Sequence, residues 1–354
     1  MPKAEVHVHL EGAIELADLL EAAADADAAL PGPAATLFDP STHRLRPGGS
    51  ELSTYLEFLD WVGSLYGSRQ RLARLAYRFA ARQSASGVRY TDVIVNPSHW
   101  GAWRHDLPGF FDALASGLDE AEADGLAPVG LCASIERGQT AAEAAELASI
   151  IAERRPRRVV ALSIDGDEGR HGRTAARFAD AFDIARRAGL GRTVHAGESS
   201  GPEGVWDALT LLHADRIDHG VRAVEDDRLV AHLAEAGVSL GICPSSNLAL
   251  GVVDRLGVHP VQRLMESGVV VTINSDDPAP LATSIEAEWA MCAAAFGWDG
   301  STLVDLARAS VRASYASAEV RAVLESELDA QAAHAEHAEL DRLGATARLL
   351  EATP

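Results

Sequence analysis

From residue 88 onward, the chain alternates between short runs rich in β-branched residues and longer stretches rich in Ala, Leu and Glu. Short strands that alternate with helices form right-handed βαβ units, and the strands of such units pair in parallel. Helices are predicted at residues 108–124, 140–154, 174–188, 203–213, 225–236 and 258–267. The eight predicted strands are Glu5–His9, Val88–Val95, Val129–Ser134, Val159–Ile164, Arg192–His195, Arg216–His219, Val238–Ile242 and Val269–Ile273.

Eight units of this kind predict the α/β fold class and a closed (β/α)8 TIM barrel, for which an open doubly wound sheet is the alternative. A barrel needs about 250 residues, so a chain of 354 residues leaves room for insertions. No Gly-x-Gly-x-x-Gly follows the first strand, which disfavours a dinucleotide-binding sheet. We therefore expect one domain over residues 1–354, with a helical insertion after the first strand at about 13–86 and extra C-terminal helices at about 284–351.

The charge and the cysteine content limit the partners and the compartment. The net charge is −21, with 52 acidic against 31 basic residues, and this balance argues against binding to nucleic acid or to an anionic membrane. Three separated cysteines without a Cys-x-x-Cys motif favour a reducing compartment. The sequence shows neither a signal peptide nor an apolar run of about 18 residues. We expect a cytoplasmic protein with no nucleic-acid or membrane partner.

The first strand carries two histidines, His7 and His9, which are separated by one residue. Side chains alternate faces along a strand, so both imidazoles project from the same face. Neutral imidazole is a common metal ligand, and the pair is therefore a candidate half-site for zinc. Two histidines on an exposed strand edge are the alternative. A metal site needs further ligands from elsewhere in the chain.

Polar residues collect where the other predicted strands end, which is where (β/α)8 enzymes place their active sites. Taken alone, each cluster has a structural explanation; an Asp-Asp pair before Pro, for example, is typical of a turn or a helix N-cap. Their joint position after five strands favours an active site. The clusters are His7 and His9, Thr193–Glu198, Arg216–Gly220, Cys243–Asn247 and Asn274–Pro278.

These clusters resemble the motifs of the adenosine deaminase family, which belongs to the amidohydrolase superfamily of metal-dependent barrels. The resemblance is colinear and covers roughly residues 2–300. Shorter similarities occur at Leu52–Asp60 and Ile164–Glu168. The four main motifs are Pro2–Gly12, His195–Glu198, Arg216–Gly220 and Ser275–Pro278.

The resemblance implies that His7, His9, His195 and Asp276 bind one zinc ion per chain. Three imidazoles and a carboxylate leave room for a water molecule in an open catalytic site. Zinc lowers the pKa of a bound water to about 7, so hydroxide is available at neutral pH. His219 would orient this water and take up its proton, a task that Asp276 can share.

The resemblance also assigns residues to the purine ring. Glu198 corresponds to the proton donor to N1, which activates the adjacent C6 and requires a protonated Glu198; burial would favour this state. Asp277 corresponds to the residue that bonds N7, and the backbone amide of Gly166 to the donor to N3. The alternatives are an N-cap for Asp277 and an ordinary turn glycine for Gly166.

The expected reaction is therefore zinc-dependent hydrolytic deamination of a small-molecule purine nucleoside or base. The first hypothesis is the conversion of adenosine and 2′-deoxyadenosine to inosine and 2′-deoxyinosine plus ammonia. The alternatives are deamination of adenine or of a larger adenine-bearing metabolite such as aminodeoxyfutalosine. A catalytically idle purine-binding barrel is the weaker alternative, since every residue that the chemistry needs is present.

The choice between nucleoside and base depends on Glu11, because adenosine-specific relatives usually carry Asp there as a contact to the ribose 5′-hydroxyl. A Glu at this position is common in relatives that deaminate free adenine or other 6-aminopurine compounds. Tyr55, Phe58 and Leu59 are candidates for an apolar wall over a sugar, with ordinary helix packing as the alternative. The segment Asn96–Trp100 departs from the family pattern and has no predicted role.

Overall fold

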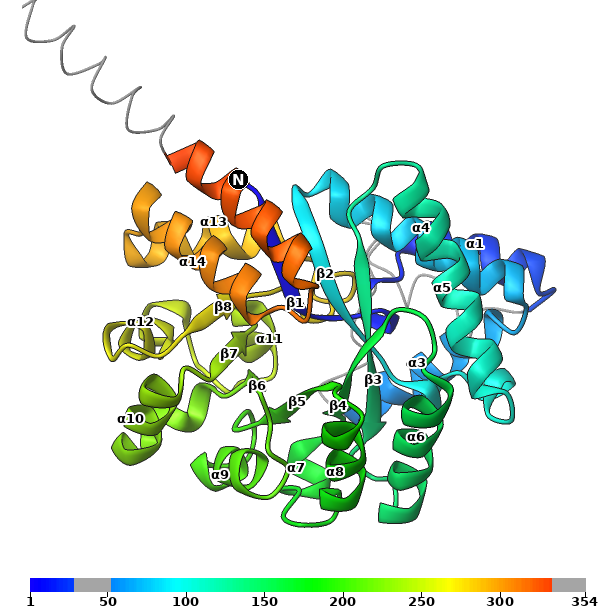
Figure 1. Cartoon of the computed structure of the whole chain (residues 1–354), viewed down its shortest axis with the longest axis horizontal. Helices are drawn as coiled ribbons and strands as arrows, with labels where there is room; N and C mark the ends of the chain where they lie inside the picture. Colours follow the sequence, from blue (N-terminus) through cyan, green and yellow to red (C-terminus); the bar gives the residue numbers. More distant parts are fainter. Residues whose placement is uncertain (29–51, 333–354) are drawn as a thin grey trace, which may run out of the picture.

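The chain folds into a barrel of eight parallel strands, as a computed structural model shows for residues 1–28 and 52–332, with only the backbone described over 52–58. The strands pair in sequence order from β1 to β8 (Figure 1). The predicted (β/α)8 fold class is confirmed. The strands are β1 Lys3–His9, β2 Val88–Val95, β3 Val129–Glu136, β4 Val159–Asp165, β5 Gly191–Ala196, β6 Arg216–His219, β7 Ser239–Ile242 and β8 Val271–Ile273.

The barrel closes between its first and last strands through a bridge that joins Val8 to Asp276. The amide of His9 donates to the carbonyl of Asp276 at 2.8 Å, and the amide of Asp276 donates to the carbonyl of His7 at 3.2 Å. Two residues earlier on the last-strand side of the seam, the side chain of Asn274 accepts from the amide of Val6 at 3.0 Å. The seam of the barrel therefore runs through three of the predicted metal ligands, His7, His9 and Asp276.

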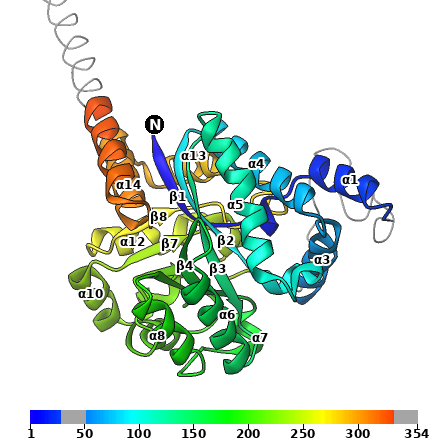
Figure 2. The ribbon, with the colours of Figure 1, turned by 45° about the vertical axis from the view of Figure 1, so that its right-hand side comes forward.

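Helices surround the barrel, with α3, α4 and α5 on one side and α10, α12 and α14 on the other (Figures 1 and 2). Their ends follow local signals. Thr140 and Glu143 form a reciprocal capping box on α6, and Gly237 ends α10 in the left-handed conformation. The helices after β2 are α5 Leu107–Ala123, α6 Ala141–Arg154, α7 Glu168–His171, α8 Ala179–Arg187, α9 Pro202–Thr210, α10 Asp227–Ala236, α11 Pro244–Ala249 and α12 Val261–Glu266.

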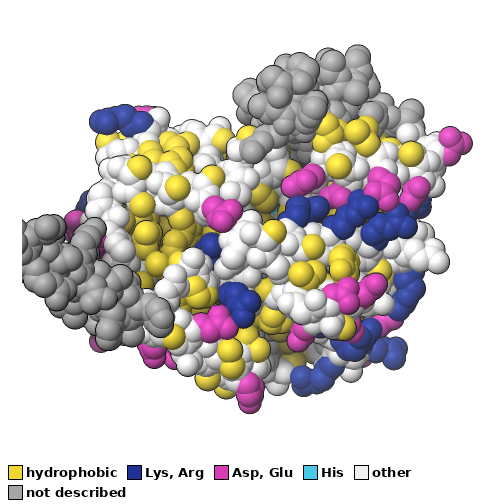
Figure 3. Space-filling model, turned by 90° about the horizontal axis from the view of Figure 1, so that it is seen from above, with side chains coloured by type: hydrophobic (Ala, Val, Ile, Leu, Met, Phe, Trp, Pro, Cys, Tyr) yellow, Lys and Arg dark blue, Asp and Glu magenta, His cyan; other side chains and the backbone are white. Residues whose placement is uncertain are grey.

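The insertion between β1 and β2 contains α1 Leu16–Asp25, α3 Leu52–Leu65 and α4 Arg69–Ala85; residues 29–51 lie outside the described part. Arginines of α4 pair with acidic residues of α1, among them Arg78 with Asp18 at 3.0 Å. On the face in Figure 3, basic and acidic side chains are interspersed, so this face lacks the continuous basic surface that nucleic-acid binding requires.

After β8 follow α13 Ile285–Phe296, α14 Gly300–Ala313 and a helix over 318–332. The rest of the predicted C-terminal helical region, 333–351, lies outside the described residues. No helix within 1–28 or 52–332 is both long and apolar enough to cross a membrane. Helix α14 packs against both β1 and β8, and α13 packs against β8, so these two helices support the seam of the barrel.

A buried ion pair lies inside the barrel beneath the strand ends. Arg216 donates to Asp92 at 2.7 Å, and its guanidinium lies 4.5 Å from the centre of the Tyr315 ring. It also lies 3.5 Å from Asp218. Both Arg216 and Asp92 are completely or almost completely buried. The polar network therefore connects the C-terminal helices to the residues under the site.

Two predicted segments differ from the structure. By itself the run Cys243–Asn247 predicts a loop, but it enters helix α11; Pro244 is the first residue of this helix, a position where proline is favoured. The helix predicted at 174–188 begins only at Ala179, because Ala175 adopts a φ of 45° that a helix cannot contain.

Candidate active site

Three imidazoles and one carboxylate converge at the carboxyl ends of β1, β5 and β8. The Nε2 atom of His195 lies 3.1 Å from the Nε2 atoms of both His7 and His9. The Oδ1 atom of Asp276 lies 3.3 Å from Nε2 of His7 and 3.4 Å from Nε2 of His9. The structure thus brings together the four predicted ligands, which lie up to 269 positions apart in the sequence as counted from His7 to Asp276.

The donor atoms fit a zinc ion. His7 donates from Nδ1 to the carbonyl of Gly241 at 2.8 Å, which leaves Nε2 as the ring atom that faces His195 and Asp276. Burial, reinforced by the nearby His7 and His9, holds the pKa of His195 well below its usual range and keeps this ring neutral. Tetrahedral zinc with bonds of about 2.0–2.1 Å separates its ligands by about 3.3 Å. The observed spacings of 3.1–3.4 Å match that edge length.

A second grouping replaces His9 and His195 with His219 and Cys243. Cys243 Sγ lies 3.4 Å from His7 Nδ1. Burial raises the pKa of the Cys243 thiol well above its usual range, so the thiolate that zinc prefers is disfavoured. The imidazole–carboxylate set is therefore the better candidate metal centre.

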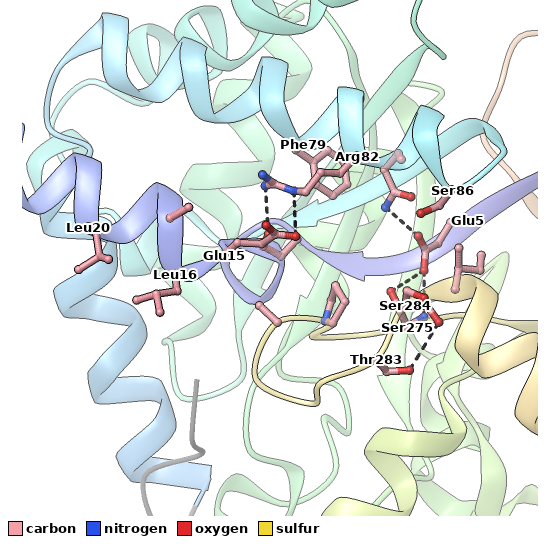
Figure 4. Close-up of a pocket in the computed structure, with 16 residues that line it drawn as sticks. Glu5, Glu15, Leu16, Leu20, Phe79, Arg82, Ser86, Ser275, Thr283 and Ser284 are labelled. Carbon is pink, nitrogen blue, oxygen red and sulfur yellow. Dashed lines mark hydrogen bonds and ion pairs between the residues drawn. The ribbon is translucent and has the colours of Figure 1, made fainter. Parts of the chain in front are cut away.

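The backbone around Asp276 is held in an unusual conformation, with a φ of 60°. Non-glycine residues rarely adopt this region unless their surroundings enforce it. The two bonds across the barrel seam fix one side of the residue. On the other side, Glu5 accepts from the amide and the hydroxyl of Ser275 at 2.9 and 2.6 Å, and from Gln83 at 2.7 Å (Figure 4). Strand β1 therefore supplies two ligands and positions a third.

A cavity of about 590 Å³ lies on the outer side of the Glu5–Ser275 contact, between α1, α4 and the connection from β8 to α13. Figure 4 shows Leu16 and Leu20 at one end of the cavity, Glu5 and Ser275 at the other, and the Arg82–Glu15 ion pair between them, with Phe79 beside Arg82. None of the four ligands lines this cavity. It is separate from the candidate metal centre.

Carboxylates lie behind the histidines, in the position from which second-layer groups orient ligand rings in many metal sites. Asp218 lies 3.6 Å from His195 Nδ1 and 3.9 Å from His7 Nδ1. Asp165 lies 3.7 Å from His9 Nδ1. The sequence places both aspartates in family motifs, but it gives no sign of this role, which depends on contacts between strands.

His219 ends β6 with a φ of 65° and faces two acidic groups. Its Nε2 atom lies 3.4 Å from Glu198 Oε1 and 3.9 Å from Asp276 Oδ2. Burial, with a contribution from His7, lowers the pKa of His219 to about 4, so the ring is neutral at pH 7 and can accept a proton. Behind it, the side chain of Asn247 lies 3.3 Å from Nδ1.

Glu198 is 8% exposed, and its Oε1 has no hydrogen-bond partner among the described residues. Burial, together with the charges of Asp276 and Glu168, raises the pKa of Glu198 well above its usual range. The protonated form of the carboxyl group is therefore favoured. A buried, protonated carboxyl beside a neutral imidazole supplies the acid and the base that a hydrolytic reaction needs.

Glu11 is 4% exposed and accepts hydrogen bonds from the segment Asn96–Trp100, for which the sequence predicts no role. Its Oε1 accepts from the amide of Asn96 at 2.8 Å and from the indole of Trp100 at 2.7 Å. Its Oε2 is buried and has no partner in the described part of the chain. The short helix η2 Pro97–His99, which lies in this segment, packs against α3. Glu11 thus presents one unsatisfied acceptor.

The remaining predicted substrate residues occupy different settings. Asp277 packs against Gly12, where a side chain would overlap its carboxylate. Gly166 has a φ of 93°, which favours glycine at this turn. Leu59 is buried in the packing of α3, whereas the side chains of Tyr55 and Phe58 lie outside the described residues. The predicted sugar wall is therefore untested.

The chain is similar to known proteins over almost its whole length. The sequence profile described as adenosine deaminase matches residues 2–331. An adenine deaminase from Rhizobium leguminosarum is 34% identical over 328 residues, 92% of this chain and 98% of that protein. An aminodeoxyfutalosine deaminase from Streptomyces avermitilis is 35% identical over 333 residues, 93% of this chain and 90% of that protein. An adenosine deaminase from Pectobacterium atrosepticum is 33% identical over 296 residues, with coverages of 83% and 86%.

Solved structures agree with these relatives. The structure of an adenine deaminase from Arthrobacter aurescens superposes with a TM-score of 0.83 at 26% identity, covering 94% of this chain and 99% of that one. An amidohydrolase from Burkholderia ambifaria with bound Zn shares the fold, with a TM-score of 0.82, 24% identity and coverages of 94% and 92%. The motifs at the strand ends and the match over the whole barrel point to one conclusion. The chain belongs to the adenosine deaminase family, a family of hydrolytic deaminases.

Proposed function

We propose that this chain removes the 6-amino group of a purine by hydrolysis and that free adenine is the substrate its site fits best. The reaction class rests on the family match and on the assembled His–Asp cluster. Adenine deaminases are among the relatives, alongside deaminases of adenosine and aminodeoxyfutalosine. The single observation that carries the choice of adenine is the fixed position of Glu11.

His7, His9, His195 and Asp276 would hold one zinc ion in this proposal. When bound, the metal would supply a water molecule that is activated at neutral pH. His219, neutral because of its burial, would accept at its Nε2 atom one proton from the water that attacks C6. Asp276, 3.9 Å from His219, can share the proton from the opposite side.

Glu198 gives its proton to N1 of the purine, which makes C6 more electrophilic. A new C6–O bond forms, the amino group takes the proton that His219 accepted, and it leaves as ammonia when the C6–N bond breaks. The proton of the new hydroxyl group returns to Glu198 as the oxygen on C6 becomes a carbonyl. The product is a 6-oxopurine. Asp277 and the backbone amide of Gly166 orient the ring through N7 and N3.

Free adenine suits Glu11 because its five-membered ring has an N–H group that could donate to this carboxylate, and a nucleoside lacks that N–H. In adenine the five-membered ring has an N–H group, whereas in adenosine the N9 position carries the sugar. A buried acceptor without a donor costs roughly 1–3 kcal/mol, and the N–H of adenine would satisfy Glu11 Oε2. Trp100 and Asn96 hold the other oxygen, so Glu11 cannot easily withdraw to admit a sugar.

A 9-substituted adenine such as adenosine, 2′-deoxyadenosine or aminodeoxyfutalosine is the second candidate. A sugar hydroxyl could also donate to Glu11 Oε2, and relatives of similar identity carry these substrate names. A catalytically idle barrel is disfavoured, since the acid, the base and the ligand set are all present.

Ammonia release from adenine, adenosine, 2′-deoxyadenosine and aminodeoxyfutalosine would test the proposal. We expect the highest kcat/KM with adenine; a higher value with any of the other three would refute the choice of substrate. Glu11→Gln places an amide donor where Oε2 stands, so kcat/KM for adenine should fall by roughly 10- to 100-fold. Glu15→Gln, at an exposed glutamate of the same segment, is the matched control and should leave kcat/KM unchanged.

A further inference from the structure

The connection from β5 to α9 carries Glu198, and its amides donate hydrogen bonds to a carboxylate from another part of the chain. Glu168, the first residue of α7, is 4% exposed. Its Oε2 accepts from the amides of Glu198, Ser199 and Ser200 at 3.0, 2.9 and 2.9 Å. Its Oε1 accepts from the amide of Gly197 at 3.3 Å and from the hydroxyl of Ser200 at 2.6 Å. Four consecutive amides therefore converge on one side chain.

We propose that Glu168 is a positioning residue: it holds the backbone of residues 197–200 and thereby fixes the carboxyl group of Glu198 against the purine. Successive amides that point to one side form an anion-binding concavity, and here the anion is supplied by the chain itself. The proposal rests on the proposed function in so far as Glu198 acts as the proton donor.

The same connection is fixed from a second side by a buried cation. Arg137 is fully buried and donates to the carbonyl of His195, the residue at which the connection leaves β5. Its other terminal nitrogen donates to the carbonyl of Gly172, just after α7. Arg137 therefore ties the metal-ligand strand to the helix that carries Glu168.

Hydrogen bonds from Arg222 to two backbone carbonyls also hold this connection. The amide of Arg222 donates to the carbonyl of Gly197 at 2.9 Å, and the guanidinium of Arg222 donates to the carbonyl of Ser199 at 2.9 Å. Gly197 has a φ of 67°, and a Cβ there would stand 2.5 Å from Val205, so the turn requires glycine. The amides of the connection thus face Glu168 while its carbonyls face β6 and its loop.

Charge supports this arrangement. Burial acts to raise the pKa of Glu168, but Arg137 and the hydrogen bonds from Ser200 and Ser199 outweigh it, so the pKa lies below its usual range. Glu168 is therefore an anion at neutral pH. Its charge stands third, after burial and Asp276, among the causes that keep Glu198 protonated.

All five bonds to Glu168 come from donors, which makes the amide of glutamine a poor replacement. In Glu168→Gln one oxygen becomes an NH₂ group, which cannot accept and would face two or three N–H or O–H donors. Glu168→Asp keeps both acceptors and withdraws them by one methylene. Glu143→Gln is the matched control, because this exposed glutamate also accepts from a backbone amide, in the capping box of α6.

We expect Glu168→Gln to lower kcat by on the order of 10²-fold, since it displaces a general acid, with little change in KM or in zinc content. Glu168→Asp should retain more activity than Glu168→Gln, and Glu143→Gln should match the parent. A kcat within threefold of the parent in Glu168→Gln, or a variant that loses its zinc, would overturn the proposal. The reverse order of Asp and Gln would also overturn it, because it would indicate a role for side-chain length alone.

A double-mutant cycle separates positioning of Glu198 from a general structural role. If Glu168 acts through Glu198, then Glu168→Gln/Glu198→Gln should be no slower than Glu198→Gln alone. A further loss that multiplies the two single effects would refute this route.

Hydrogen exchange at residues 197–200 tests the contact without any substrate. Glu168→Gln should accelerate exchange of these amides relative to Glu143→Gln, and unchanged exchange would refute the contact itself. This measurement stands even if the chain deaminates a purine other than adenine. Failure of the proposed function and failure of the Glu168 proposal are therefore distinguishable.

Discussion

A methyl group added at Gly12 should disable the site by displacing Asp277. A Cβ built on Gly12 would stand 2.5 Å from Cγ and 2.6 Å from Cβ of Asp277, and nearer still to a carboxylate oxygen. Carbon atoms in contact lie about 3.5–4.0 Å apart, so Asp277 would have to move by about 1 Å. The carbonyl of Gly12 accepts from the amide of Ala279 at 2.9 Å, which keeps the two segments together and prevents a simple retreat.

This overlap should lower both the stability of the fold and the rate of the reaction. Overpacking of this size lowers stability by about 1–3 kcal/mol. A displacement of about 1 Å at a substrate-positioning group can lower the rate by on the order of 10²-fold. Gly12→Ala should therefore fold and keep its zinc, because the four ligands are not displaced, but lose most of its kcat/KM.

Ammonia release, zinc content and thermal unfolding of Gly12→Ala would be measured beside Gly101→Ala. Gly101 is the matched control, since no described atom lies within 4 Å of a Cβ placed there. If Gly12→Ala is folded and its kcat/KM stays within threefold of the parent, Asp277 does not contact the reacting purine, and the reasoning fails.

Three further outcomes are expected. Dialysis against a chelator should abolish activity, and about one zinc ion per chain should restore it; full activity without metal would exclude the proposed centre. Arg216→Met leaves Asp92 buried without its 2.7 Å partner and should lower the free energy of unfolding by about 3–5 kcal/mol, measured by chemical denaturation; a loss below 1 kcal/mol would show that this pair is not needed. Because Glu198 must be protonated and its pKa is raised by burial, kcat/KM should hold through neutral pH and fall as the pH rises through that pKa; a rate that keeps rising into the alkaline range would contradict its role as the acid.

Patterns of residues within one segment were sufficient to predict the barrel and the polar clusters at its strand ends. The alternation of strands and helices depends on local periodicity, and the ends of Val88–Val95 and Arg216–His219 agree with β2 and β6. These clusters meet because parallel strands bring their carboxyl ends to the same rim, whereas the choice of the four metal ligands among them came from the resemblance to the adenosine deaminase family. The meeting of the strand ends at one rim could therefore be predicted from the sequence, because it depends only on the order and direction of the strands.

Contacts between side chains that are distant in the sequence were not accessible in this way. The bond from Trp100 to Glu11 joins residues 89 positions apart, and the contacts of Glu168 with residues 197–200 span about 30 positions. No periodicity marks such pairs, because they depend on how loops fold over the rim. The same reason hides the contact between Glu5 and Ser275, which fixes the backbone next to a ligand.

The seam of the barrel also sets the order in which the site can form during synthesis. Strand β1 leaves the ribosome first, but Ser275, which Glu5 holds, follows 270 positions later. Pairing between such distant segments carries a large loop-closure cost and forms slowly. The nascent chain therefore carries His7 and His9 for most of its synthesis without the carboxylate that completes the set. In the proposed metal centre, capture of zinc should consequently coincide with the final closure of the barrel, and zinc uptake should report that closure.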